Sequence, residues 1–290
     1  MKRKPFTALR FHENGFLVIF FVYTLSFLLC FFLALMGRGV ERVTEAVLFV
    51  PPFLAVYLPV LFLLHSEEGR ESPLGAQRIK KECWTAELLF VFCAFALGTG
   101  GALLCGKLGL PLFFYGMALP TDFSLLSLFA VVVFGAFCEE ILLRGVMQTH
   151  LATLGGVASV LVSASLSAAL GLSLSSLPLL LAAGGLCAIA RHRTDSLWGS
   201  IFVSAAARLG IYLVSADVWQ GLAARAGVVL LSVLLLSFAT VAFVAVFFVS
   251  RQRYTNRTVC RNRKECVTAC LLALLFLGLS VGASFLISTL

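Results

Sequence analysis

Glu139, Glu140 and Arg144 lie inside one long apolar stretch, 125–154, which carries no other formal charge. A charged side chain near the centre of a lipid bilayer costs roughly 2.5 to 3.5 kcal/mol on insertion scales. Three such groups within six residues must therefore be paired with one another, face a polar cavity, or take part in chemistry. This stretch restricts what the chain can fold into more than any other part of the sequence.

The composition predicts a polytopic membrane protein of the all-α class. Sixty per cent of the 290 residues are hydrophobic and only 12% are charged, with a mean hydropathy of +1.02. A soluble domain carries about 25% charged residues. Several segments run about 20 residues without a charge, which is long enough to cross the hydrocarbon core. The first of them, 15–36, is longer than the core of a signal peptide and is predicted to be a spanning helix.

Nine spanning helices are predicted from these apolar segments. The second contains Pro51 and Pro52, so we expect a kink or a broken first turn there. The sixth is short enough to be tilted or partly re-entrant. The predicted spans are 15–36, 46–64, 85–104, 124–149, 157–175, 177–190, 197–214, 227–249 and 267–287.

The distribution of basic residues predicts the orientation of the chain. With the N-terminus inside, sixteen Lys and Arg residues fall on the cytoplasmic side and four on the opposite side. This asymmetry follows the positive-inside rule. It predicts a multi-pass protein of a bacterial cytoplasmic membrane, and it accounts for the net charge of +8 without nucleic acid as a partner.

The nine cysteines predict neither a disulfide framework nor a zinc site. Most of them lie inside apolar segments, and no CxxC pair occurs. Near the charged cluster, Glu139, Glu140 and Cys138 are the potential metal ligands. Cys138 points about 100° away from Glu139 on a helix and is a poor third ligand. The sequence therefore predicts no metal and leaves the cofactor unknown.

Small residues predict which helices lie inside the bundle. On the fifth and seventh spans they recur at every fourth position, which lets helix backbones approach closely in lipid. These two spans are expected to lie beside the helix that carries the glutamates. The two stripes are Ser159, Ser163, Ser167, Gly171 and Ser175 on the fifth span, and Ser200, Ser204 and Arg208 on the seventh.

The sequence Glu139-Glu140-x-x-x-Arg144-Gly145 resembles a motif of the CPBP family of intramembrane proteases, which includes CAAX prenyl endopeptidases and bacteriocin-processing relatives. A second motif of the family, R-T-x-S-L-W leading into a later helix, is matched by 193–198. The resemblance implies a four-helix catalytic core at 120–215, flanked by further transmembrane helices at 1–119 and 216–290.

The resemblance implies a catalytic role for Glu139, Glu140 and Arg144. In the family a glutamate of the pair is thought to activate water, a task shared with a histidine of the next helix. A histidine and a following asparagine or aspartate on a later helix stabilise the oxyanion. Such chemistry suits a carboxylate and an imidazole in a cavity of low dielectric constant.

This chain departs from the family pattern at the partner positions. Alignment of the fifth span places Ser167 at the aromatic position and Gly171 at the first histidine. On the seventh span, Ser204 falls at the second histidine and Arg208 at the following asparagine. The four histidines of the chain are not placed to replace the missing two. They are His12 before the first span, His65 in a loop, His150 about 15 Å along the helix from Glu140, and His192 at a helix end.

An alternative interpretation assigns the charged groups to structure. Glu140 and Arg144 have the i, i+4 spacing of a helical ion pair, with the acid first. Arg208 is on the face expected to carry the asparagine, and we hypothesise that it is a structural counter-ion for Glu139.

Three functions remain open from the sequence. The first is a CPBP-type endopeptidase that cleaves membrane-proximal peptide bonds. The second is a pseudoprotease that binds a membrane or peptide partner. The third is a small transporter with a buried Glu/Arg site, and the R-T-x-S-L-W match argues against it. Expected partners are membrane lipid and a membrane-associated protein or peptide.

Overall fold

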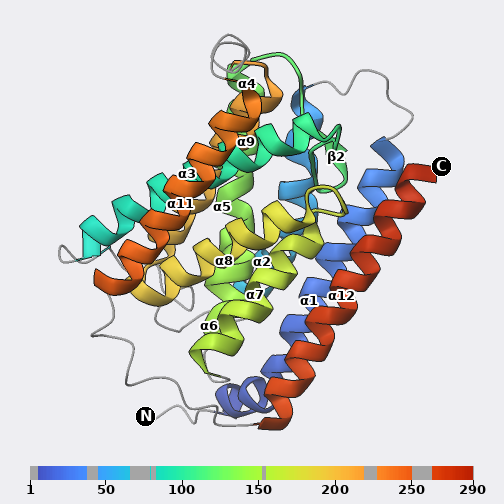
Figure 1. The fold of residues 1–290 in the computed structure, drawn as a ribbon. Coiled ribbons are helices and arrows are strands. Elements are labelled where there is room, and N and C mark those ends of the chain that lie inside the picture. Colours follow the sequence, from blue (N-terminus) through green and yellow to red (C-terminus); the bar gives the residue numbers. More distant parts are fainter. Residues whose placement is uncertain are drawn as a thin grey trace.

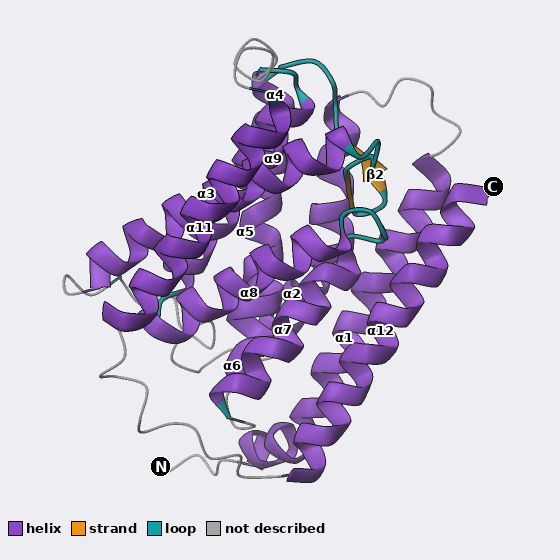
Figure 2. Cartoon of the chain, in the orientation of Figure 1, coloured by secondary structure: helices purple, strands orange, loops and turns teal. Residues whose placement is uncertain are grey.

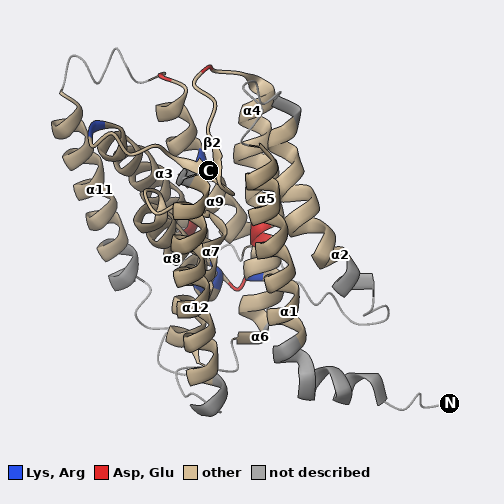
Figure 3. Ribbon diagram, turned by 90° about the vertical axis from the view of Figure 1, so that its right-hand side faces the viewer, with Lys and Arg blue, Asp and Glu red and all other residues tan. Residues whose placement is uncertain are grey.

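A computed structural model describes residues 6–37, 45–65, 79, 83–151, 155–218, 227–249 and 263–289. These residues are almost entirely helical, and a single short hairpin lies at one end of the bundle (Figure 2). Charged residues are sparse along the helices, and acidic residues on α5 lie within the bundle (Figure 3). The predicted all-α membrane fold is confirmed.

The helices fall into the nine regions expected from the apolar segments, within the residues that the structure describes (Figure 1). The helices of the N-terminal half are α1 (Phe6–Gly37), η1 (Glu45–Phe49), η2 (Pro51–Tyr57), α2 (Leu58–His65) and α3 (Trp84–Lys107). The strands β1 (Phe113–Phe114) and β2 (Met117–Ala118) follow. The fourth region contains α4 (Leu125–Leu128), η4 (Phe129–Phe134), α5 (Gly135–Glu140), η5 (Ile141–Met147) and α6 (Gln148–Leu151). The last regions are α7 (Gly156–Leu170), α8 (Leu177–Thr194), α9 (Leu197–Ser215), α11 (Val228–Val249) and α12 (Arg263–Thr289).

Among the residues that the structure describes, five helices are long and apolar enough to cross a membrane. They are Val18–Gly37, Trp84–Lys107, Leu125–Met147, Leu197–Ser215 and Cys266–Ile287. Three shorter apolar helices cover Val47–Leu61, Gly156–Leu170 and Val228–Val244. Spanning segments of these lengths define a multi-pass membrane protein.

The helix that carries the glutamates alternates between α and π geometry. Its two π-helical segments, η4 and η5, lie directly before and after α5. Each π turn contains an additional residue, which changes the direction of later side chains and frees a backbone carbonyl. The second span is irregular as well: at Pro51 and Pro52, where we expected a break, a 3₁₀ segment gives way to π-helix η2.

Helices α3 and α9 approach closely in the middle of the bundle because glycines lie between them. A Cβ atom built on Gly98 would lie 2.2 Å from the carbonyl oxygen of Ala207. One built on Gly210 would lie 2.6 Å from Oγ1 of Thr99. In the opposite direction α3 is covered by α11, which accepts a hydrogen bond from Cys93. This contact holds α9, and with it Arg208, at the centre of the molecule.

Helix α7 packs between α8 and the pair formed by α1 and α12. The rings of Tyr23 and Phe276, from α1 and α12, have centroids 4.7 Å apart, and the Tyr23 hydroxyl donates to the carbonyl of Leu166. The serines of the α7 stripe are buried, at Ser159, Ser163 and Ser167. The helix ends at Leu170, so the remaining members of the stripe, Gly171 and Ser175, lie beyond it.

Candidate active site

Both carboxylate oxygens of Glu139 accept hydrogen bonds. Its Oε1 atom accepts from the hydroxyl of Ser167, on α7, at 2.6 Å. Its Oε2 atom accepts from the hydroxyl of Tyr115, at 3.1 Å, and forms an ion pair with Nη2 of Arg208, on α9. Glu139 is 7% exposed. This carboxylate is therefore buried, paired and hydrogen-bonded from three separate parts of the chain.

Both terminal nitrogens of Arg208 have hydrogen-bond partners. Its Nη1 donates to the carbonyl of Val131 at 3.2 Å, in the π-helical segment η4, and its Nη2 donates to the Tyr115 hydroxyl at 3.1 Å. The guanidinium carbon lies 4.6 Å from the centroid of the Phe114 ring, which adds a cation–π contact. The pairing that we expected between Arg208 and Glu139 is present.

Glu140 has fewer partners than Glu139. Its Oε2 atom lies 3.5 Å from Nε of Arg144, one helical turn along, and makes no hydrogen bond to any described residue. Glu140 is 1% exposed. Glu140 and Arg144 thus form a long ion pair inside the protein, and one oxygen of Glu140 has no hydrogen-bond partner among the described residues.

Arg144 joins three helices and has no solvent exposure. Its Nη1 donates to Oγ of Ser163, on α7, at 2.9 Å, and its Nη2 donates to the carbonyl of Gly184, on α8, at 2.7 Å. A Cβ on Gly184 would meet the Cβ of Ser167 at 2.9 Å, so a side chain there would separate α7 from α8. Arg144 therefore organises the helices around the carboxylates.

Replacing Arg144 with lysine is expected to destabilise the protein by about 2–3 kcal/mol. The planar guanidinium reaches two helices at once, and a lysine keeps the charge but cannot reproduce that fork. Thermal unfolding of the purified protein in nanodiscs measures the effect. A lysine variant as stable as the wild type would contradict the role given to the fork.

The Tyr115 side chain reaches the site from the β1–β2 hairpin. The strands pair antiparallel, with Phe114 opposite Met117, and Tyr115 and Gly116 form the turn with φ angles of 53° and 73°. Two residues with positive φ are typical of a type I′ turn, a conformation that glycine adopts easily and tyrosine rarely. The Gly116 amide donates to the carbonyl of Gly171, which fastens the turn to the end of α7.

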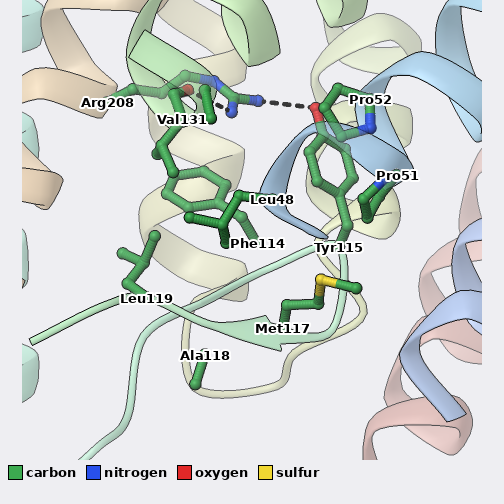
Figure 4. A pocket seen from close by; sticks show the side chains of 11 residues that line it. Leu48, Pro51, Pro52, Phe114, Tyr115, Met117, Ala118, Leu119, Val131 and Arg208 are labelled. Carbon is green, nitrogen blue, oxygen red and sulfur yellow. Dashed lines mark hydrogen bonds between the residues drawn. The ribbon is translucent and has the colours of Figure 1, made fainter. Parts of the chain in front are cut away.

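Two cavities lie on either side of the hairpin and Arg208. The polar one contains both glutamates and has room for about one ordered water molecule. The other, shown in Figure 4, is apolar apart from Arg208 and the Tyr115 hydroxyl. Phe114 and Arg208 line both cavities. The hairpin and Arg208 thus form the partition between a polar chamber and an apolar one.

The divergent positions of the sequence motif are not all at the site. Ser167, Ser204 and Arg208 line the polar cavity with the two glutamates. Gly171 does not line it, and a Cβ there would lie 2.3 Å from Cδ1 of Leu180. The residue of α7 that contacts Glu139 is therefore Ser167, one turn before the position that the alignment gave to the histidine.

Residues of the site that were not identified from the sequence include Phe114, Tyr115 and Cys187. Phe114 and Tyr115 belong to a hairpin that has no hydropathy pattern, and Cys187, on α8, lines the cavity without a motif around it. The only local indication of the hairpin in the sequence is a tyrosine–glycine pair followed by two apolar residues.

No histidine lines the polar cavity within the described part of the chain. The imidazole of His192 lies against Gly156, where a Cβ would be 2.9 Å from it. The side chains of the other three histidines are outside the described residues. No group of three or more His, Cys, Asp and Glu side chains that could hold a metal occurs among the residues described.

Residues 121–209 match the family model for type II CAAX prenyl endopeptidase Rce1-like proteins. The match supports membership of the CPBP family for this part of the chain. The match begins after the hairpin and ends one residue beyond Arg208, so it includes both glutamates, Arg144 and the cavity residues of α7, α8 and α9 except Ile211. No curated protein and no solved structure gives a significant match to the chain.

The matched range does not supply the whole site. Tyr115 and Phe114 precede the matched range, yet the Tyr115 hydroxyl contacts the first glutamate of the motif and the Phe114 ring contacts Arg208. The contact between the hairpin and residues 121–209 therefore involves residues outside the range that the family model matches.

Proposed function

We propose that this protein is a pseudoprotease of the CPBP type, which keeps the protease fold and binds a membrane-associated protein or peptide. The observation that supports this most directly is the pairing of Glu139 with Arg208. A general base needs an oxygen that can take a proton from water in the site. Both oxygens of Glu139 are already occupied, by Ser167 on one side and by Tyr115 and Arg208 on the other.

The groups that replace the family's histidines point to the same function. Ser204, at the position of the second histidine, lines the cavity, and no histidine lines that cavity among the described residues. Ser167, one turn before the position of the first histidine, donates its hydroxyl to Glu139, a carboxylate that is itself paired with Arg208. Neither serine therefore has a free base of the kind that a serine nucleophile needs. Arg208 is held by Val131 and Tyr115 in addition to Glu139. A group fixed by this many contacts stabilises a folded state, whereas oxyanion stabilisation requires donors aimed at a substrate atom.

Slow hydrolysis by the second glutamate is the alternative function. Glu140 has an oxygen without a hydrogen-bond partner among the described residues, and it lines a cavity with room for about one water molecule. Any endopeptidase activity on a membrane-proximal peptide bond is therefore assigned to Glu140, with Arg144 as its counter-ion.

A cleavage assay distinguishes the two functions. Purified wild type and the Glu139→Gln/Glu140→Gln double variant are incubated in nanodiscs with a library of membrane peptides, and products are identified by mass spectrometry. We expect the same products, at background level, from both proteins. Cleavage that the double variant loses would refute the pseudoprotease, and a Glu140→Gln single variant would then test whether Glu140 is the base.

We also infer the placement of the chain in the membrane. The sixteen basic residues on one side against four on the other support an N-terminus inside a bacterial cytoplasmic membrane. The organisation that we propose has a CPBP-like core at 120–215 between transmembrane helices at 1–119 and 216–290. Its surroundings are membrane lipid.

A further inference from the structure

The hairpin fills the space through which Glu139 would otherwise connect to the apolar cavity. The Tyr115 side chain lines the apolar cavity, while its hydroxyl contacts Glu139, which lines the polar one. Ala118, at the rim of the apolar cavity, is exposed. Removal of the tyrosine side chain would therefore join the two chambers and open a route from the rim to both glutamates.

The hairpin is held in this position by contacts that oppose a backbone preference. A tyrosine at a φ of 53° is uncommon and costs of the order of 1 kcal/mol, so the surrounding contacts must maintain it. They are the Tyr115 bonds to Glu139 and Arg208, the Gly116 bond to Gly171, and the bonds that Ser176 makes to the backbone of Phe113.

We propose that the β1–β2 hairpin occupies the partner-binding site from within the chain, and that an extended peptide segment of a partner takes its place. This inference rests on the proposed function. The phenol hydroxyl gives a donor to Glu139 and an acceptor to Arg208, and an incoming group must supply both. A peptide unit carries one N–H donor and one C=O acceptor, and in an extended segment both are free to bond sideways. An aromatic side chain of that segment would replace Phe114 against the guanidinium.

Cys187 provides a reporter for the opening of the polar cavity, because it lines that cavity and lies outside the hairpin. In a variant that keeps Cys187 as its only cysteine, the rate of labelling by a small neutral methanethiosulfonate in nanodiscs measures access. Tyr115→Phe removes the hydroxyl alone, and Tyr115→Ala removes the ring as well. Leu119→Ala is the matched control, since Leu119 lines the apolar cavity but has no bond to Glu139 or Arg208.

We expect Tyr115→Phe to label about 10-fold faster than the reference, because a buried hydrogen bond to a charged group is lost. Tyr115→Ala should label at least as fast as Tyr115→Phe, and Leu119→Ala should label at the reference rate. Equal rates in all four proteins, with Cys187 fully reactive after denaturation, would overturn the proposal. So would an equal acceleration in Leu119→Ala, which would indicate general loosening.

The partner class is tested with a peptide that has the hairpin's own sequence, LFFYGMA, taken from 112–118. Added to Tyr115→Ala, it should bind in place of the hairpin and restore slow labelling, whereas LFFAGMA should not. Failure of the first peptide to protect Cys187 would refute an extended peptide as the occupant. Because labelling does not depend on cleavage, this outcome is distinguishable from a failure of the proposed function.

Discussion

Replacing Arg208 with methionine is expected to destabilise the protein by about 3–5 kcal/mol. The substitution leaves the Glu139 carboxylate buried without its cation, and breaking one side of a buried ion pair costs that amount. It also removes the donor to Val131 and the cation above the Phe114 ring. Thermal or denaturant unfolding of the protein in detergent micelles measures the change.

A double-variant cycle separates the ion pair from the other contacts of Arg208. Adding Glu139→Gln to Arg208→Met should recover a large part of the lost stability, because no unpaired charge then remains. Ser204→Ala is the control, since Ser204 lines the same cavity and makes no bond to either charged residue. If the loss of stability in the double variant equals the sum of the losses in the two single variants, the two charges are not coupled.

The second large effect is expected at Gly98, where α3 meets α9. Gly98→Ala should destabilise the protein by about 1–3 kcal/mol, because the new methyl group would lie 2.2 Å from a backbone oxygen of Ala207. The helices must then separate, which displaces Arg208, one residue further along. The same unfolding measurement applies, and a larger side chain such as leucine should prevent folding.

Gly106, on the same helix, is the matched control. A Cβ there has no neighbour within 4 Å, so Gly106→Ala should be neutral or stabilising by about 0.5 kcal/mol, the usual gain from replacing a helical glycine. If both alanine variants have the same stability, the close approach of α3 and α9 does not limit what position 98 can hold.

The apolar segments predicted the helices well because a bilayer leaves few alternatives to helical spans. The same constraint made the charged residues conspicuous, and the fourfold spacing of Ser204 and Arg208 placed both on the face that meets Glu139. The lipid around an apolar segment of about 20 residues requires that segment to form a helix. This part of the fold can therefore be predicted from the sequence.

The remaining parts of the site depend on contacts between distant residues. Tyr115 reaches Glu139 only because the hairpin folds back into the bundle, and a tyrosine with positive φ has no sequence signature. The motif alignment placed Gly171 one helical turn after Ser167, at the position of the first histidine, whereas α7 ends at Leu170. The π-helical segments beside α5 also have more residues per turn than an α-helix. A sequence analysis that assumes 3.6 residues per turn therefore misplaces the side chains that follow them.

The charged core has a consequence for how the protein responds to the membrane potential. Its two carboxylates and two guanidinium groups carry a net formal charge of zero. A voltage does work on an elementary charge moved across the membrane, about 2.3 kcal/mol for every 100 mV, and none on a cluster whose charges cancel and move together. Helices α5, η5 and α9, which together carry the four charged groups, can therefore shift as a unit without sensing the voltage of an energised membrane. A chain with methionine at 208 would carry one uncompensated carboxylate in that field, and its conformation would become sensitive to the potential.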